Sequence, residues 1–381
     1  MKRTILPWIQ ENKNKLYLPQ ISMNPNAIDF LEDNPTLIYW RELSMNPNAI
    51  DLLKKNLDKI DWFTLSYNKS PDLITLIEMD LSEESPFIEL SRLYRLDYGI
   101  LSKNANENVL LFLEKLVDLM DFFVLSSNVD AIFLLEKYPQ KIHWDALSRN
   151  INAIHLLETN VNKIHWYNLS SNINAISLLE TNLDKINWNQ LCWNINAISI
   201  LEKNVDKINW SILSCNIRAI PILEKNLNKI DWRNLSRNIY AIHLLEKKIP
   251  FIDWKYLSGN INAISMLEKN IDKIDWCELS SNVNAIPILE QNIDKIDWTR
   301  LSSNSNAIHI LEKNIDKINW RALSFNSSIF IWDYCFYKKR MDIHREELMK
   351  KVYHPDRVST NLNKGYNIHE DVYLSDYDDD N

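Results

Sequence analysis

Residues 188–209 read WNQLCWNINAISILEKNVDKIN, and residues 210–231 read WSILSCNIRAIPILEKNLNKID. The two segments align without a gap, and each begins with a tryptophan. The same 22-residue interval separates nine successive tryptophans, at positions 144, 166, 188, 210, 232, 254, 276, 298 and 320. A fixed period of this length is the sequence signature of a repeat architecture.

Other positions of the repeat are also constant when the tryptophan is taken as position 1. In the eight complete repeats from residue 144 to residue 319, positions 4 and 14 are leucine, position 7 is asparagine, position 10 is alanine, position 15 is glutamate and position 21 is isoleucine. Position 5 is serine except at Cys192, and position 17 is asparagine except at Lys248. The constant apolar residues recur three and four residues apart, which is helical spacing.

The repeat also extends upstream of residue 144, where its anchoring residues are weaker. These anchors are Leu18, Trp40, Trp62, Tyr98 and Phe122. We therefore predict residues 1–17 to be an N-terminal cap and residues 18–336 to be one array of about fourteen repeats, with an insertion near residues 68–97. One array, rather than two or three domains, then accounts for most of the chain.

Each repeat is expected to contain two short helices. In the repeat that begins at residue 144, the apolar residues 153–157 predict one helix, with Asn152 as its N-cap and Asn160 as a left-handed C-cap. A second helix is expected within residues 162–172, around the next tryptophan. Helices this short are not stable alone in water. They must stack on their neighbours, which predicts an all-α fold, an α-solenoid of helix–turn–helix repeats with a C-terminal cap.

The asparagine at position 7 forms a column along such a solenoid. We expect it to cap helices and to form hydrogen bonds between neighbouring repeats. Leucine-rich repeats are the alternative, because they share this length and the phrase L-x-x-N. They also require leucines five residues before and two residues after the asparagine, and those positions hold polar residues in most repeats here.

Residues 43–62, LSMNPNAIDLLKKNLDKIDW, carry the clearest family resemblance. The segment resembles the asparagine-rich 22-residue repeats in proteins of unknown function from large (giant) DNA viruses of amoebae. The likeness covers roughly residues 18–336 and rests on a dozen or so positions at fixed spacing. It implies a viral origin, and it implies no catalytic residues, because the family has no activity that can be transferred.

The composition excludes several functional classes. A net charge of −8 argues against a general nucleic-acid binder. Three glycines leave no Gly-rich phosphate loop, so we expect no nucleotide cofactor. No apolar run is long enough to cross a membrane, and the start, MKRTILPWIQENK, is too short in apolar residues for a secretory signal. Scattered cysteines then indicate a reducing compartment, and we expect the cytoplasm, that of the host if the protein is viral.

The ionisable residues suggest neither catalysis nor metal binding. His155 and His243 hold the same position four repeats apart, so they cannot meet at a metal in a linear stack. The four cysteines form no C-x-x-C pair. The carboxylates and lysines recur in most repeats, whereas an active site is normally singular. We therefore expect no enzyme, no cofactor and no metal.

Positions 2, 3 and 6 vary between repeats and are predicted to lie on the tryptophan-bearing helix. Arginine, tyrosine and tryptophan at such positions are the residue types that dominate protein interfaces. The candidates for contact with a protein partner are Arg149, Tyr167, Trp193, Arg233, Arg237, Tyr256 and Phe325.

The pattern decays after Trp320. Residues 337–356 are expected to form a C-terminal capping helix, and residues 357–381 an acidic, disordered tail. The phrase His354-Pro355-Asp356 is similar to the signature of J-domain co-chaperones, although the residues after it do not suggest the further helix of such a domain.

Three functions follow from this sequence. The first is a non-enzymatic scaffold for protein–protein interaction, acting in the host cell, because extended solenoid surfaces commonly bind proteins. The second is a structural or packaging component of the virion. The third is a co-chaperone that acts through the His-Pro-Asp phrase.

Overall fold

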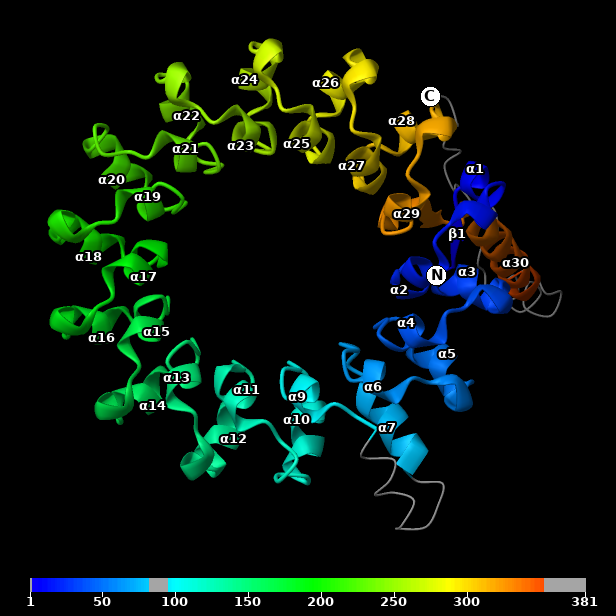
Figure 1. Cartoon of the computed structure of the whole chain (residues 1–381). Coiled ribbons are helices and arrows are strands. Elements are labelled where there is room, and N and C mark those ends of the chain that lie inside the picture. Colours follow the sequence, from blue (N-terminus) through cyan, green and yellow to red (C-terminus); the bar gives the residue numbers. More distant parts are fainter. Residues whose placement is uncertain (1, 82–94, 353–381) are drawn as a thin grey trace, which may run out of the picture. The chain divides into compact units, whose positions relative to one another are not determined.

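The computed structural model describes residues 2–81 and 95–352 (Figure 1). It is an all-α repeat solenoid with short helices spaced about 22 residues apart. The two strands in the described ranges, β1 (Arg3–Ile5) and β2 (Phe330–Trp332), form a two-stranded sheet. The chain divides into two compact parts, one of residues 5–330 and one that combines residues 1–4 with residues 331–381.

The part formed by residues 5–330 has two layers of helices. The helix that begins at position 1 of each repeat lies in the inner layer (Figure 1). These inner helices are α2 (Leu18–Met23), α4 (Trp40–Ser44), α6 (Trp62–Leu65), α9 (Tyr98–Leu101), α11 (Phe122–Ser127), α13 (Trp144–Leu147), α15 (Trp166–Ser170), α17 (Trp188–Trp193), α19 (Trp210–Leu213), α21 (Trp232–Leu235), α23 (Trp254–Ser258), α25 (Trp276–Ser281), α27 (Trp298–Ser303) and α29 (Trp320–Leu323).

A second helix in each repeat lies in the outer layer. These outer helices are α1 (Pro7–Gln10), α3 (Ile28–Asp33), α5 (Ile50–Lys54), α7 (Leu73–Leu81), α10 (Glu107–Glu114), α12 (Ile132–Lys137), α14 (Ile154–Glu158), α16 (Ile176–Glu180), α18 (Ile198–Lys203), α20 (Ile220–Lys225), α22 (Ile242–Leu245), α24 (Ile264–Glu268), α26 (Ile286–Gln291) and α28 (Ile308–Glu312). Most are therefore one or two turns long.

A 3-10 turn after most outer helices leads back to the inner layer. These turns are η1 (Lys13–Lys15), η2 (Pro35–Leu37), η3 (Leu57–Lys59), η4 (Pro139–Lys141), η5 (Val161–Lys163), η6 (Leu183–Lys185), η7 (Val205–Lys207), η8 (Ile249–Phe251), η9 (Ile271–Lys273), η10 (Ile293–Lys295) and η11 (Ile315–Lys317). A further turn, η12 (Ser327–Ile329), precedes β2. The sequence did not predict this third element of the repeat.

The core lies between the two layers and runs along the whole array. In the repeat that begins at Trp188, Leu191, Ala197 and Leu201 are fully buried, and so are their equivalents in the neighbouring repeats. These side chains belong to one cluster of buried apolar residues that extends along the array. The array thus gains by stacking the apolar burial that one short helix pair cannot supply.

The column of position 7 asparagines forms hydrogen bonds between repeats, as predicted. The Nδ2 group of Asn172 donates to the carbonyl oxygens of Ser148 and Asn150 in the preceding repeat, at 3.2 and 3.0 Å, and its Oδ1 atom accepts from the backbone of Asn174 at 3.0 Å. Twelve asparagines make both carbonyl bonds: Asn46, Asn68, Asn128, Asn150, Asn172, Asn194, Asn216, Asn238, Asn260, Asn282, Asn304 and Asn326.

The constant serine at position 5 joins the two ends of its own repeat. The Oγ atom of Ser148 donates to the carbonyl of Trp144 at 2.7 Å and accepts from the backbone N–H of His165 at 3.0 Å. The residue at position 22 then caps the next inner helix in most repeats. For example, the side chain of Asp231 accepts from the backbone N–H of Asn234 at 3.1 Å.

Two predicted helix caps were wrong. Asn152 does not cap α14, because its own N–H is bound by Asn150 and its side chain donates to the carbonyl of Val129 in the preceding repeat. Asn160 is not left-handed: its φ is −133°, and its Nδ2 atom donates back to the carbonyl of Leu156. Both asparagines stabilise the repeat through bonds that differ from the predicted caps.

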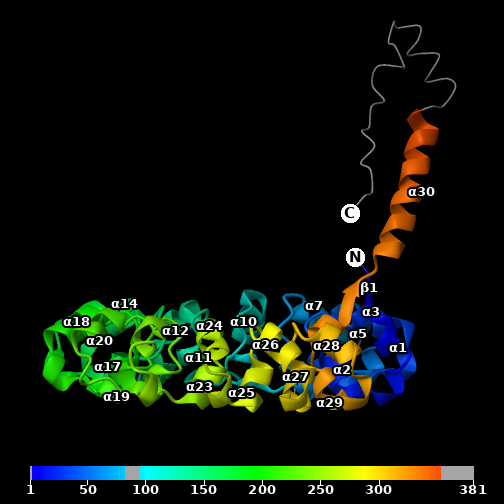
Figure 2. The same ribbon diagram turned by 90° about the horizontal axis from the view of Figure 1, so that it is seen from above.

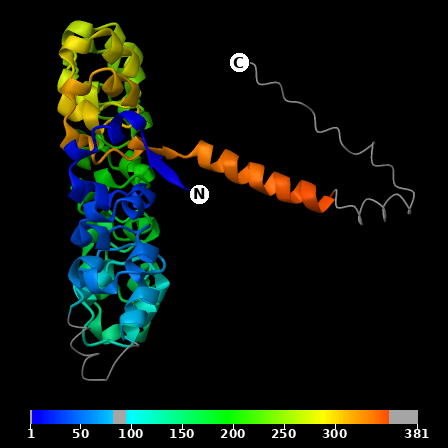
Figure 3. The ribbon, with the colours of Figure 1, turned by 90° about the vertical axis from the view of Figure 1, so that its right-hand side faces the viewer.

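The array of residues 5–330 returns to its own start and forms a closed ring (Figure 1). The backbone N–H of Leu6 donates to the carbonyl of Ile329 at 3.0 Å, and that of Tyr17 donates to the Oγ atom of Ser324 at 2.9 Å. Seen edge-on, the ring of residues 5–330 is a flat band (Figure 2). Figure 3 shows the same band from the side, with the chain's first and last repeats adjacent.

Ring closure changes the role predicted for residues 1–17. They were expected to cap an open end of the solenoid, but residues 5–17 pack instead against the last repeat. The side chain of Ile9 is fully buried at this contact. Residues 5–17 are therefore covered by the last repeat of the same array and do not border an open end.

The second compact part contains helix α30 (Tyr334–Val352). The side chains from Lys338 to Lys351 are exposed. Near its start the guanidinium of Arg3 lies 4.2 Å from the centre of the Trp332 ring. The phrase His354-Pro355-Asp356 and the acidic tail of residues 357–381 lie outside the described residues.

Candidate protein-binding surface on the inner helices

The inner helices carry the variable positions of the repeat. Each inner helix has the outer layer on one side and neighbouring repeats on two others (Figure 1). Positions 2 and 6 are four residues apart and share one helical face. Position 2 is exposed in most repeats, whereas position 3 is mostly half-buried against the adjacent repeats. We call the exposed residues at positions 2 and 6 the inner surface.

Three of the four aromatic contact candidates belong to this inner surface, whereas Tyr256, at position 3, is half-buried. The side chains of Tyr167, Trp193 and Phe325 are 46%, 52% and 58% exposed. Exposed tryptophan and phenylalanine are unusual, because each places a large apolar area in water. Arg149 is also exposed, but it follows the end of α13 rather than lying within the helix as predicted.

The structure brings three of the predicted candidates together. The guanidinium of Arg237 lies 3.6 Å from the centre of the Tyr256 ring in the next repeat, and that of Arg233 lies 5.7 Å from it. Asp253 completes the cluster, since its Oδ2 atom accepts from Arg233 at 3.0 Å and its Oδ1 atom accepts from the N–H of Tyr256. An arginine stacked on an aromatic ring loses less freedom when a partner binds it.

The remaining candidates lie apart from that cluster. Arg149, Tyr167 and Trp193 follow one another in three consecutive repeats, whereas Phe325 lies in the last repeat. The hydroxyl of Tyr167 accepts from the Nε2 atom of Gln190 at 2.7 Å, which fixes the ring in place. The structure therefore distributes the candidates along the inner surface instead of gathering all seven at one site.

The sequence analysis missed three exposed aromatic residues of the inner surface. Phe63 and Tyr67 occupy positions 2 and 6 of one early repeat, with ring centres 6.4 Å apart, and Phe123 occupies position 2 of another. The repeat register alone was sufficient to identify them. A shallow hollow beside Phe123 is lined by residues 119–123 and 140–143.

Three of the described histidines each contact a glutamate on a neighbouring outer helix rather than one another. His155 and Glu136 lie on neighbouring outer helices with Nε2 and Oε1 2.8 Å apart. His243 with Glu224 and His309 with Glu290 repeat the same arrangement. Within residues 2–81 and 95–352, no group of three histidine, cysteine, aspartate or glutamate side chains is placed to hold a metal ion.

One thiol in the ring has a charged partner. The Sγ atom of Cys277 lies 3.3 Å from the Oδ2 atom of Asp297, and this hydrogen bond raises the pKa of the thiol. The pKa of Asp297 is lowered, chiefly because its carboxylate accepts from the backbone N–H of Arg300. The aspartate thus keeps its charge at neutral pH and holds Cys277 in the less reactive thiol form.

We expect Asp297→Asn to make Cys277 several-fold more reactive toward iodoacetamide near pH 8. The amide removes the negative charge that disfavours the thiolate, while asparagine remains a good N-cap for α27. The rate is measured by mass spectrometry of the peptide that contains Cys277. Asp231→Asn is the control, because Asp231 caps the inner helix α21 in the same way but lies two repeats before the helix that carries Cys277. Equal rates for both variants and the unaltered protein would contradict the expectation.

No described helix is both long enough and apolar enough to pass through a bilayer. The same range shows a ring of repeats with exposed aromatic side chains on its inner helices, as at Tyr167 and Trp193, and also away from them, as at Tyr240 and Phe251. Comparison of the chain with protein-family models, with curated proteins and with solved structures finds no match.

Proposed function

We propose that this protein is a non-enzymatic, ring-shaped scaffold that binds a protein partner on its inner surface. The observation that carries the proposal is the pairing of Arg237 with Tyr256, beside Arg233. Tryptophan, tyrosine and arginine are the residues on which interface affinity most often depends. The constant positions of the repeat support the ring, and the variable positions are free to specify a partner.

The resemblance to repeats from large DNA viruses supports the host cell as the place where the protein acts. If the chain is viral, its partner is a protein of the host cell, and the cytoplasm is the compartment that the sequence favours. A packaged virion component would also use a stable ring, but nothing in the geometry favours that role. The inner surface, with its exposed aromatic side chains, favours binding instead.

The test is affinity capture from an amoebal host lysate followed by mass spectrometry. We expect the variant Trp193→Ala, Arg233→Ala, Arg237→Ala to retain at least about tenfold less of a specific partner than the unaltered chain, since each residue is a typical hot spot. The helical circular dichroism spectrum should stay unchanged, because all three side chains are exposed.

A matched control uses three exposed residues of the outer side of one repeat. The variant Lys247→Ala, Lys248→Ala, Phe251→Ala removes the same kinds of side chain and should leave capture intact. Equal capture by both variants would refute the inner surface as the binding site. Failure of the unaltered chain to capture any specific protein, together with its abundance in purified virions, would favour the packaging role.

A further inference from the structure

The ring is closed by one repeat that is divided between the two ends of the array. Residues 5–17 read ILPWIQENKNKLY, and residues 219–231 of an unbroken repeat read AIPILEKNLNKID. Proline, asparagine and lysine coincide at positions 12, 17 and 20 of the repeat, and large apolar residues occupy the buried places. Helix α1 and turn η1 supply the outer half of this divided repeat, and residues 320–330 supply its inner half.

Two contacts that cross the junction, and one within residues 5–17, have counterparts in an unbroken repeat. The contacts therefore follow the repeat register and are not an incidental meeting of two chain ends. The N–H of Tyr17 donates to the Oγ atom of Ser324 at 2.9 Å, as that of Asp231 donates to the Oγ atom of Ser214 at 3.1 Å. The Nδ2 atom of Asn12 donates to the carbonyl of Trp8 at 2.8 Å, as that of Asn226 donates to the carbonyl of Ile222 at 2.9 Å. The ammonium group of Lys15 lies 5.2 Å from the centre of the Trp320 ring, and that of Lys229 lies 5.1 Å from the centre of the Trp210 ring.

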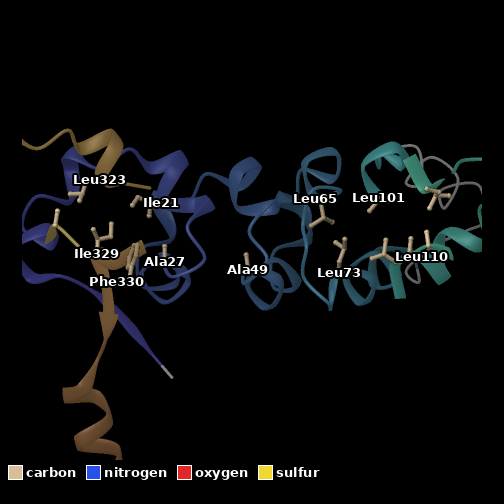
Figure 4. Close-up of a cluster of buried hydrophobic side chains, with 14 of the residues drawn as sticks. Ile21, Ala27, Ala49, Leu65, Leu73, Leu101, Leu110, Leu323, Ile329 and Phe330 are labelled. Carbon is tan, nitrogen blue, oxygen red and sulfur yellow. The ribbon is translucent and has the colours of Figure 1, made fainter. Parts of the chain in front are cut away.

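Apolar side chains fill the junction between the two ends. Leu323, Ile329 and Phe330 lie beside Ile21 and Ala27 of the first repeat (Figure 4). All five are at most 4% exposed. Two aromatic pairs also cross the junction, with Trp8 and Trp320 ring centres 6.4 Å apart and Phe30 and Phe330 ring centres 6.1 Å apart. We call this junction, formed by residues 5–30 and 320–330, the seam.

The seam leaves buried side-chain polar groups unsatisfied, although the β1–β2 sheet also joins its two ends. In the described ranges, three buried side-chain polar atoms lack a hydrogen-bond partner in the protein: Trp8 Nε1, Gln20 Oε1 and Asn24 Nδ2. All three lie in the seam. The next asparagine of the column, Asn46, donates to two carbonyl oxygens, both at 3.0 Å. Each unsatisfied buried group weakens the seam relative to its neighbours.

We propose that the ring opens and recloses at the seam, with residues 5–17 acting as the latch. At every other junction the chain runs covalently from one repeat to the next, so breaking the contacts there bends the array without opening it. Only the seam combines the absence of a covalent link with unsatisfied buried groups. Opening there gives a bulky or elongated partner a route to the inner surface, but the inference concerns the ring itself and does not depend on the proposed function.

The test is native-state hydrogen exchange of the full chain, followed by mass spectrometry. Segment 5–17 is compared with segment 219–231, which has the same register and equivalent asparagine and lysine contacts but lies in an unbroken repeat. We expect the amides of the latch to be protected at least about tenfold less. Residues 320–330 should exchange at the same rate as the latch, because opening uncovers both faces, whereas fraying of a chain end alone would leave them protected.

Two serine variants make the test specific. Ser324→Ala removes the acceptor for the Tyr17 N–H and should speed exchange in segments 5–17 and 320–330 together. Ser214→Ala removes the equivalent bond from an unbroken repeat and should leave both segments unchanged. Equal protection of the latch and segment 219–231 in the unaltered chain would overturn the proposal. Fast exchange of the latch without matching exchange of residues 320–330 would overturn it as well.

Discussion

Replacing Asn172 by aspartate is expected to destabilise the folded ring by at least about 3 kcal/mol at pH 7. The side chain is 2% exposed, and its Nδ2 group donates to two carbonyl oxygens of the preceding repeat. Aspartate has the same shape, but it places a carboxylate oxygen where the amino group was. Two hydrogen bonds are lost, and a buried negative charge then faces two carbonyl dipoles.

The measurement is urea unfolding followed by circular dichroism, with Asn174→Asp as the control. Asn174 lies two residues away and is exposed, although its Nδ2 atom also donates to the preceding repeat, at 2.9 Å from the carbonyl oxygen of Ile151. Water can solvate the new carboxylate at that site, so we expect a loss below about 1 kcal/mol. Similar losses for the two variants would show that the column of buried asparagines does not hold neighbouring repeats together.

The cost of Asn172→Asp should also depend on pH. Burial and the facing carbonyls raise the pKa of the new carboxyl in the folded state above its unfolded value, which is about 3.9. A protonated carboxyl can donate one bond, so the variant should be least impaired below about pH 4. Its stability relative to the unaltered chain should fall as the pH rises from there through the folded pKa. An identical loss at pH 5 and pH 7 would contradict a buried, ionised aspartate.

The periodic residues made much of the fold predictable. A leucine at positions 4 and 14 with an alanine at position 10 can pack closely only between two layers of helices. The column of asparagines was also predictable, because a buried amide repeated every 22 residues must satisfy its hydrogen bonds in the adjacent repeats. The individual caps were not, because Asn152 and Asn160 had several possible partners and the sequence does not rank them.

Ring closure could not be predicted from the period. The period specifies which residues touch in adjacent repeats, whereas closure depends on the small rotation between repeats accumulated around the array. The half-repeat of residues 5–17 was also obscured by substitution, since Trp8 and Ile9 replace the usual aliphatic pair and no anchoring tryptophan precedes them. The Arg237–Tyr256 pair joins different repeats, so its geometry likewise required the curvature.

Leu201→Ala is expected to destabilise the ring by about 2–5 kcal/mol. Leu201 occupies position 14, is fully buried and lies within the core that runs between the two layers. Truncation removes its apolar contacts and leaves a cavity that short, tightly stacked helices cannot easily fill. Ile217→Ala is the control, since Ile217 is 42% exposed and its truncation should cost less than about 1 kcal/mol.

Combined leucine variants separate a chain of neighbouring contacts from a single shared core. Leu289 holds the same position four repeats away, so the losses from Leu201→Ala and Leu289→Ala should add within about 0.5 kcal/mol. Leu179 lies in the adjacent repeat and shares packing with Leu201, so its truncation should combine non-additively. Urea unfolding of the single and double variants measures both couplings. Strong coupling between the distant pair would show that strain passes around the closed ring, because repeats that interact only with their neighbours cannot transmit it.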